Sequence, residues 1–208
     1  VRIINKARED MKTFFVVKEG LVFTGESGTE LLFRLVRAAI LGSPAGGNVV
    51  GSTLEHPATA SARVRWCPVA GKENISIAHD KDQAMVTAQD YAAQVTENTR
   101  VATIIQTSPV TGMAVDVAAV AKAIRERAPE CFIIVDSIQH AAHGVMDMEA
   151  CGVDACALAG YKVFSRHNYG VAWVSPRLST LPHEKLDGTA DDFWELGTRD
   201  TGAFATFS

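Results

Sequence analysis

The sequence predicts an α/β fold: a three-layer α/β/α arrangement around a mostly parallel sheet. Beta-branched apolar runs alternate along the chain with amphipathic helical patterns, as in parallel α/β proteins. Two of these runs, 101–107 and 131–137, are almost continuously apolar, as expected for strands covered by helices on both faces. With 208 residues, 47% of them hydrophobic, the chain is long enough to bury a substantial core.

Six apolar runs rich in beta-branched residues are predicted as strands. They are residues 48–53, 63–69, 101–107, 131–137, 155–160 and 171–175. Segments 29–41 and 115–128 repeat apolar residues at helical spacing and are predicted as helices, and 87–95 is a third helix candidate. Segment 175–192 is the most loop-like and is expected to lead out of the sheet domain.

Charge and composition exclude several classes of function. The formal net charge is -4 and there is no run of basic residues, which argues against nucleic-acid binding and against an anionic membrane surface. Residues 1–10 lack the apolar core of a signal peptide, and the most apolar stretch, 31–41, is interrupted by Arg34 and Arg37, so no membrane span is expected. Four cysteines without a CxxC pair indicate reduced structural thiols in a cytoplasmic protein.

Polar residues gather where the predicted strands end. In an open parallel sheet, ligands bind beyond the carboxyl ends of the strands. The positions concerned are Glu55 and His56, Thr107 and Ser108, Asp136, Gln139 and His140, and Lys162. This distribution predicts a ligand site at that edge of the sheet.

Each of these features has an ordinary structural explanation beside the functional one. The stretch "TGESGTE", 24–30, offers either a helix start that binds phosphate or a plain cap by Ser27 or Thr29. His56 either stacks on a planar ligand or is a surface loop histidine. Asp136 either meets a cation such as a protonated pyridine nitrogen or caps the next helix.

Lys162 and the pair His183–Glu184 also carry groups that are used in catalysis or metal binding. A single lysine such as Lys162 is usually a solvated surface residue. His183 and Glu184 begin like a zinc-binding HExxH helix, but Asp187 stands where the second histidine is required. No metal site is therefore predicted.

Taken in order along the chain, the motifs resemble the fold type I pyridoxal-phosphate enzymes, specifically the class V aminotransferase and cysteine desulfurase group. The matching stretches are "SGTE" (27–30), "EHPA" (55–58), "TSPVTG" (107–112), "VDSIQ" (135–139), "AGYK" (159–162) and "ELGTRDTG" (195–202). Each stretch is a weak signal alone, whereas the ordered set covers nearly the whole chain.

The resemblance implies a role for each matching residue. Lys162 would hold pyridoxal 5'-phosphate as an internal aldimine, exchange it for an external aldimine with the substrate, and move the substrate's alpha proton. Asp136 would pair with the pyridinium nitrogen, and Gln139 would hydrogen-bond the ring hydroxyl. The remaining cofactor contacts would come from His56 on the ring face, Gly28 and Thr29 at the phosphate, Ser108 and Tyr161 nearby, and Thr198 reaching the phosphate of the neighbouring subunit.

The resemblance implies a class V aminotransferase-type enzyme that acts on an amino acid, a small-molecule substrate, and forms a homodimer with shared active sites. Cysteine desulfuration or other carbon–sulfur lysis, and amino-acid epimerisation, are alternatives on the same fold. Arg199, in "GTRD", resembles the isopenicillin-N-epimerase-like branch and is a candidate substrate contact. A non-catalytic α/β binding protein is the alternative from another class.

The chain departs from the family pattern around Lys162 and is expected to be shorter than the family's members. Ala159 and Tyr161 stand where the family commonly has serine and histidine, and "SRHN", 165–168, replaces the usual Gly-Pro. Residues 1–208 are expected to hold most of the large cofactor-binding domain. The family's N-terminal segment and its C-terminal small domain are expected to lie outside this chain.

Overall fold

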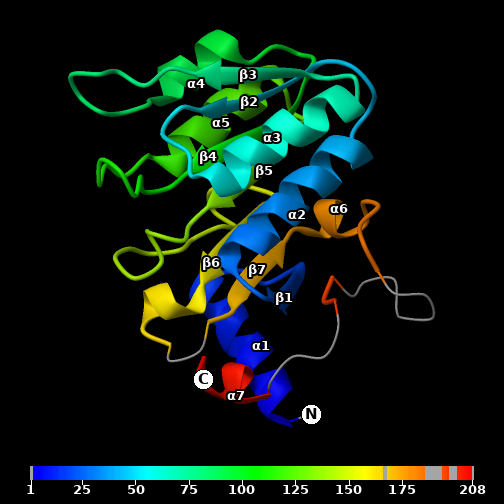
Figure 1. The fold of residues 1–208 in the computed structure, drawn as a ribbon, viewed down its shortest axis with the longest axis vertical. Coiled ribbons are helices and arrows are strands. Elements are labelled where there is room, and N and C mark those ends of the chain that lie inside the picture. The colour runs from blue at the N-terminus through cyan, green and yellow to red at the C-terminus, as the bar shows by residue number, and fades with distance from the viewer. Residues whose placement is uncertain (1, 166–167, 186–193, 197–200, 208) are drawn as a thin grey trace.

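The protein is built around one seven-stranded sheet in the order β1-β7-β6-β5-β4-β2-β3 (Figure 1). The computed structural model describes residues 2–165, 168–185, 194–196 and 201–207. The strands are β1 (Leu21–Gly25), β2 (Asn48–Ser52), β3 (Glu73–Ile77), β4 (Thr99–Ile105), β5 (Phe132–Asp136), β6 (Ala155–Ala159) and β7 (Gly170–Val174). Only β7 runs against its neighbours β6 and β1, so the predicted mostly parallel sheet is confirmed for the described residues.

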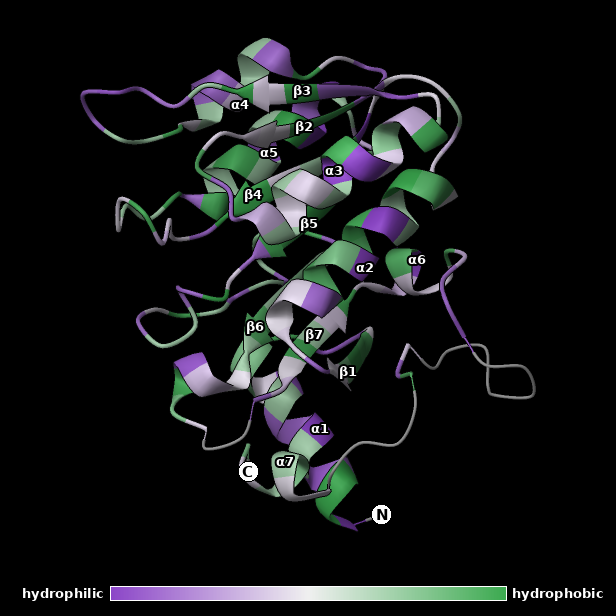
Figure 2. Cartoon of the chain, viewed as in Figure 1, coloured by the Kyte–Doolittle hydropathy of each residue, from purple (hydrophilic) through white to green (hydrophobic). Residues whose placement is uncertain are grey.

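Helices cover both faces of the sheet, which gives the predicted three layers (Figure 1). One face packs against α2 (Gly28–Gly42), α3 (Pro57–Val69) and the short α6 (Pro176–Ser179). The other face packs against α1 (Arg2–Phe15), α4 (Ala88–Gln94), α5 (Val117–Arg127) and the short α7 (Thr201–Ala205). Figure 2 shows hydrophobic residues on central strands such as β4, β5 and β7, whereas the edge strand β3 is largely hydrophilic.

Five of the six predicted strands and all three predicted helices are confirmed, with small differences at their ends. The strand predicted at 63–69 is wrong, because these residues form the second half of α3. The valines that indicated a strand, Val64 and Val69, are each 63% exposed, while Arg63 and Cys67 are buried. The segment therefore follows helical geometry with an inner face of small and polar residues.

Several elements, among them α1, β1, β3 and α7, were not predicted from the sequence. The strand expected at 63–69 is replaced in the sheet by β3, an edge strand whose residues are mostly solvent-accessible. The segment predicted to leave the domain starts with α6, which still packs on the sheet through the fully buried Leu178. Residues 186–192 of that segment lie outside the described residues.

The remaining composition-based expectations concern membranes and thiols. No helix in the described ranges is long and apolar enough to cross a bilayer. All four cysteines are free thiols, and three of them, Cys67, Cys131 and Cys156, are buried. Burial raises the pKa of Cys67 to about 11 and that of Cys131 to about 12, which makes these thiols unreactive packing groups.

Candidate active site

A cavity of about 270 Å³ opens beyond the carboxyl ends of the parallel strands. This is the edge at which the sequence predicts a ligand. The cavity is lined by Ser27, Gly28, Thr29, His56, Ile105, Pro109, Asp136, Ile138, Gln139, Ala159, Tyr161 and Asn168. Six residues proposed from the sequence for the cofactor therefore meet around one space, although they are spread over more than 130 residues of chain.

The start of α2 forms one wall of this cavity. Ser27 is the N-cap, and its Oγ accepts a hydrogen bond from the backbone N–H of Glu30 at 3.1 Å. Gly28 and Thr29 follow in the first turn, where backbone N–H groups have no intrahelical acceptor. A side chain at position 28 would come within 2.6 Å of Ile138, so glycine lets the helix start approach the sheet. Ser27 can therefore cap the helix while the backbone N–H groups of the first turn remain available to an anion, so the two alternatives given by the sequence are compatible.

Asp136 ends β5 and places a carboxyl group against the cavity. The residue is only 3% exposed, and its Oδ1 accepts a hydrogen bond from the backbone N–H of Ile138 at 3.0 Å. Burial raises the pKa of Asp136 to about 7; the Ile138 hydrogen bond opposes this shift and the carboxylate of Glu55 adds to it. A cationic N–H group in the cavity would stabilise the charged carboxylate.

His56 faces Asp136's cavity from the loop between β2 and α3. It is the N-cap of α3, and its Nδ1 accepts a hydrogen bond from the backbone N–H of Ala58 at 3.1 Å. A neutral ring in this arrangement carries its proton on Nε2. The ring is exposed and lines the cavity, as required of a group that covers a planar ligand.

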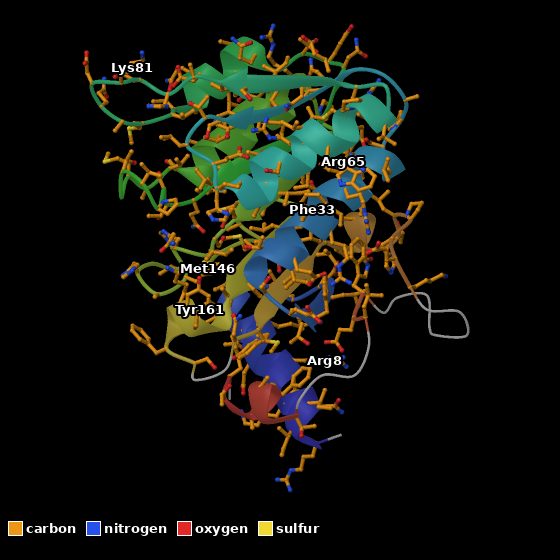
Figure 3. All side chains as sticks on the ribbon, in the orientation of Figure 1. Arg8, Phe33, Arg65, Lys81, Met146 and Tyr161 are labelled. Atoms are coloured by element: carbon orange, nitrogen blue, oxygen red, sulfur yellow. The ribbon has the colours of Figure 1, made fainter. Side chains whose placement is uncertain are left out.

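Tyr161 and Lys162 lie on a short 3-10 turn, Gly160–Val163, that directly follows β6. Tyr161, labelled in Figure 3, lines the cavity and is exposed. Lys162 is partly buried, and its Nζ lies 5.3 Å from the centre of the Tyr161 ring. The amine is thus held over the phenol ring beside the cavity, and Lys162 is not one of the lining residues.

The other residues proposed from the sequence are placed differently. Gln139 lines the cavity, three residues after Asp136. Ser108 is buried and does not line it; its Oγ accepts hydrogen bonds from the N–H groups of Val110 and Thr111. Ser108 therefore shapes the turn that carries its neighbour Pro109 to the cavity. Thr198 and Arg199 lie outside the described residues.

Several lining residues were not among the proposed site residues. Four of them lie at or just after the ends of strands, close in sequence to the proposed site residues: Ile105, Pro109, Ile138 and Ala159. Their position at the strand ends is the feature of the sequence from which they could have been predicted. Asn168 comes from the stretch that departs from the family pattern, and it reaches the cavity because β7 runs antiparallel to β6. The turn after β6 therefore returns to the same edge of the sheet.

Comparison with known proteins shows which family the chain resembles. The family model described as "Aminotransferase class-V" matches residues 1–199. A cysteine desulfurase of Nostoc sp. is 21% identical over 175 residues, covering 83% of this chain and 42% of that protein. A probable cysteine desulfurase of Mycoplasma pneumoniae is 24% identical over 203 residues, covering 97% of this chain and 48% of that protein. The chain thus spans a little under half the length of these relatives.

Solved structures share the fold. The cysteine desulfurase CsdA from Escherichia coli superposes with a TM-score of 0.87 at 18% identity, over 99% of this chain and 55% of that one. An aspartate aminotransferase of subgroup IV from Thermus thermophilus reaches a TM-score of 0.68 at 24% identity, over 85% of this chain and 49% of that one. With nearly all of its residues matched by the family model, the chain belongs to the class V aminotransferase family.

Proposed function

We propose that the protein is a pyridoxal 5'-phosphate-dependent enzyme of the class V aminotransferase type that acts on an amino acid. The observation that carries this proposal is the cavity that places a buried carboxyl group, Asp136, and a helix start, Gly28–Thr29, around one space. Lys162 lies on the adjoining turn. Family membership supports the same cofactor.

The residues present suit this cofactor on three counts. The cavity volume of about 270 Å³ is close to the lower end of the range of roughly 300–1,000 Å³ for small-molecule sites. The helix start offers N–H groups and a favourable dipole to a phosphate. Burial raises the pKa of the Asp136 carboxyl group, and a protonated pyridine nitrogen beside it would stabilise the charged form.

Each residue then has a defined task. When bound, the cofactor supplies an electron sink for negative charge at the substrate's alpha carbon. Asp136 keeps the ring nitrogen protonated, and the N–H groups of Gly28 and Thr29 hold the phosphate. His56 covers one face of the ring, and Gln139 donates to the ring hydroxyl. Lys162 would provide the amine that attaches the cofactor and would move the proton at the substrate's alpha carbon.

The same proposal includes the parts of the protein that lie outside the described residues. Thr198 would reach the phosphate held by a neighbouring subunit, in a homodimer with shared sites. Arg199 would contact the substrate. Residues 1–208 would form most of the large cofactor-binding domain, with the remainder of the family's length supplying the small domain. The protein would act in the cytoplasm.

Cysteine desulfuration is the second candidate, because the relatives named above are described as cysteine desulfurases. None of this chain's four cysteines is a lining residue of the cavity, so a sulfur-accepting cysteine would have to come from outside residues 1–208. Epimerisation is possible with the same cofactor and lysine. A panel of amino acids assayed for keto acid, for sulfide with alanine, and for loss of chirality separates the three reactions.

Borohydride reduction of the complete protein tests the proposal itself. Loaded protein should show a visible absorption band that shifts on reduction, and peptide mass mapping should then find the cofactor fixed to Lys162. Lys162→Ala should lose this label, whereas Lys122→Ala, at an exposed position on α5, should keep it. A colourless protein that takes up no added cofactor, or a label on another lysine, would overturn the proposal.

A further inference from the structure

A buried polar cluster lies directly beneath the cavity wall formed by His56. Its centre is the carboxylate of Glu55, whose side chain is fully buried although the next residue is exposed. Glu55 Oε1 accepts a hydrogen bond from the backbone N–H of Ser52 at 2.8 Å. Thr103 Oγ1, on β4, lies 2.8 Å from both carboxylate oxygens.

The counter-charge comes from Arg63, on the helix that His56 caps. Arg63 Nη2 lies 3.5 Å from Glu55 Oε2, and its side chain is 1% exposed. Its Nη1 donates to Asn74 Oδ1 at 3.0 Å and to the backbone carbonyl of Ile75 at 3.1 Å, both on β3. Since removing two charges from water is costly, such a pair persists only where further hydrogen bonds support it. The cluster thereby fastens the β2–α3 loop to β3 and β4.

Gly51 provides the space that this cluster fills. A Cβ at position 51 would lie 2.2 Å from Thr103 Oγ1, 2.5 Å from Glu55 Oε1 and 2.6 Å from Arg63 Cζ. The absence of a side chain at Gly51, near the end of β2, therefore leaves the space that the Glu55 carboxylate and the Arg63 guanidinium occupy.

We propose that Glu55 is a positioning residue that fixes His56 against the cofactor. Glu55 and His56 are consecutive in the loop, and the Glu55 side chain is buried while His56 is exposed and lines the cavity, so anchoring Glu55 fixes the backbone from which the His56 ring projects. The anchor is on β4, where Ile105 pairs with Asp136 of β5 and also lines the cavity. The cluster therefore sets the spacing between the two walls that carry His56 and Asp136.

This inference rests on the proposed function for what His56 contacts, but its structural part can be tested separately. If Glu55 acts through His56, Glu55→Gln should weaken cofactor binding only while His56 is present. We expect a loss of about tenfold in the natural background, the size typical of residues that support a binding group. In a His56→Ala background the same change should cost less than about twofold, within the usual limits of additivity.

The measurement is a titration of the complete protein with pyridoxal 5'-phosphate, followed by visible circular dichroism. Asp154→Asn is the matched control: Asp154 is also a buried carboxylate paired with arginine, but it does not line the cavity. It should lower thermal stability without changing cofactor affinity. An equal loss for Glu55→Gln in both backgrounds, or no loss in either, would show a purely structural pair. If Glu55→Gln does not fold, Thr103→Val takes its place in the comparison of the two backgrounds, because it removes the hydroxyl that anchors the Glu55 carboxylate.

Hydrogen exchange of the cofactor-free protein provides the independent readout. The Ala58 N–H donates to His56 Nδ1, so its exchange rate reports how firmly the ring is held. Glu55→Gln should speed Ala58 exchange by about tenfold relative to Asp154→Asn. Unchanged exchange would overturn the positioning role. Failure of the natural protein to bind the cofactor would instead refute the proposed function, and the exchange measurement would still decide the role of Glu55.

Discussion

Replacing Asp136 by asparagine should stabilise the cofactor-free protein above neutral pH. The carboxyl group is buried beside the cavity, and burial raises its pKa from the ordinary value of 3.8 to about 7. Between these two values the folded chain keeps a proton that the unfolded chain has lost. Because the folded state binds more protons in this interval, its stability falls as the pH rises.

The magnitude follows from the width of the interval. Each pH unit within it changes the free energy of unfolding by about 1.4 kcal/mol. The interval from 3.8 to about 7 therefore amounts to about 4 kcal/mol of stability, lost by about pH 7. Asparagine has no proton to lose, and its side-chain oxygen can still accept the Ile138 N–H.

Urea unfolding of both proteins from pH 4.5 to 8.5, without cofactor, measures this difference. The natural protein should lose stability relative to Asp136→Asn as the pH rises, and the two curves should become parallel above about pH 7.5. Added pyridoxal 5'-phosphate should reverse the order at pH 8, because the carboxylate then has its cationic partner. A constant difference between the two curves across the whole range would refute the assignment of the raised pKa to Asp136.

Two other substitutions test the framework of the site. Gly170→Ala would place a Cβ 2.5 Å from backbone atoms of Ser27. We therefore expect the free energy of unfolding in urea to fall by roughly 1–3 kcal/mol and the cofactor to bind more weakly. An unchanged urea midpoint would show that the loop before α2 can move aside. Asp154→Asn should lower the free energy of unfolding by roughly 2–4 kcal/mol, because it weakens two ion pairs, with Arg125 at 2.7 Å and with Arg177 at 2.8 Å. A thermal unfolding midpoint equal to that of the natural protein would contradict this.

Much of the sheet was predictable because its central strands are buried on both faces. The runs that become β4 and β5 are apolar throughout, so their pattern cannot be satisfied at a solvated surface. The edge strand β3 has no such requirement, and its polar sequence gives little signal. The second half of α3, residues 63–69, does not look helical in sequence, in part because the inner face of the helix, with Ala62, Arg63 and Cys67, lacks large apolar residues.

The site could be predicted in part for a similar reason. Residues such as His56 and Asp136 follow strand ends directly, and the parallel sheet brings those ends to one edge. Ser108 could not be placed from sequence, because its hydrogen bonds to the following turn depend on local backbone geometry. The partners of Glu55 come from three different elements, so their meeting is a consequence of tertiary packing alone.

The pairing of β1 with β7 has a consequence for how the protein is made. β1 is an edge strand, and within the described residues its sheet partner is β7, with Leu21 opposite Val174. β1 can therefore pair in the sheet only after about 150 further residues have been synthesised. Since the helix start at Gly28 follows β1 directly, the wall of the cavity that contains Gly28 cannot be fixed against the sheet before β7 has been made. A nascent chain that ends before β7 should be unable to capture its cofactor.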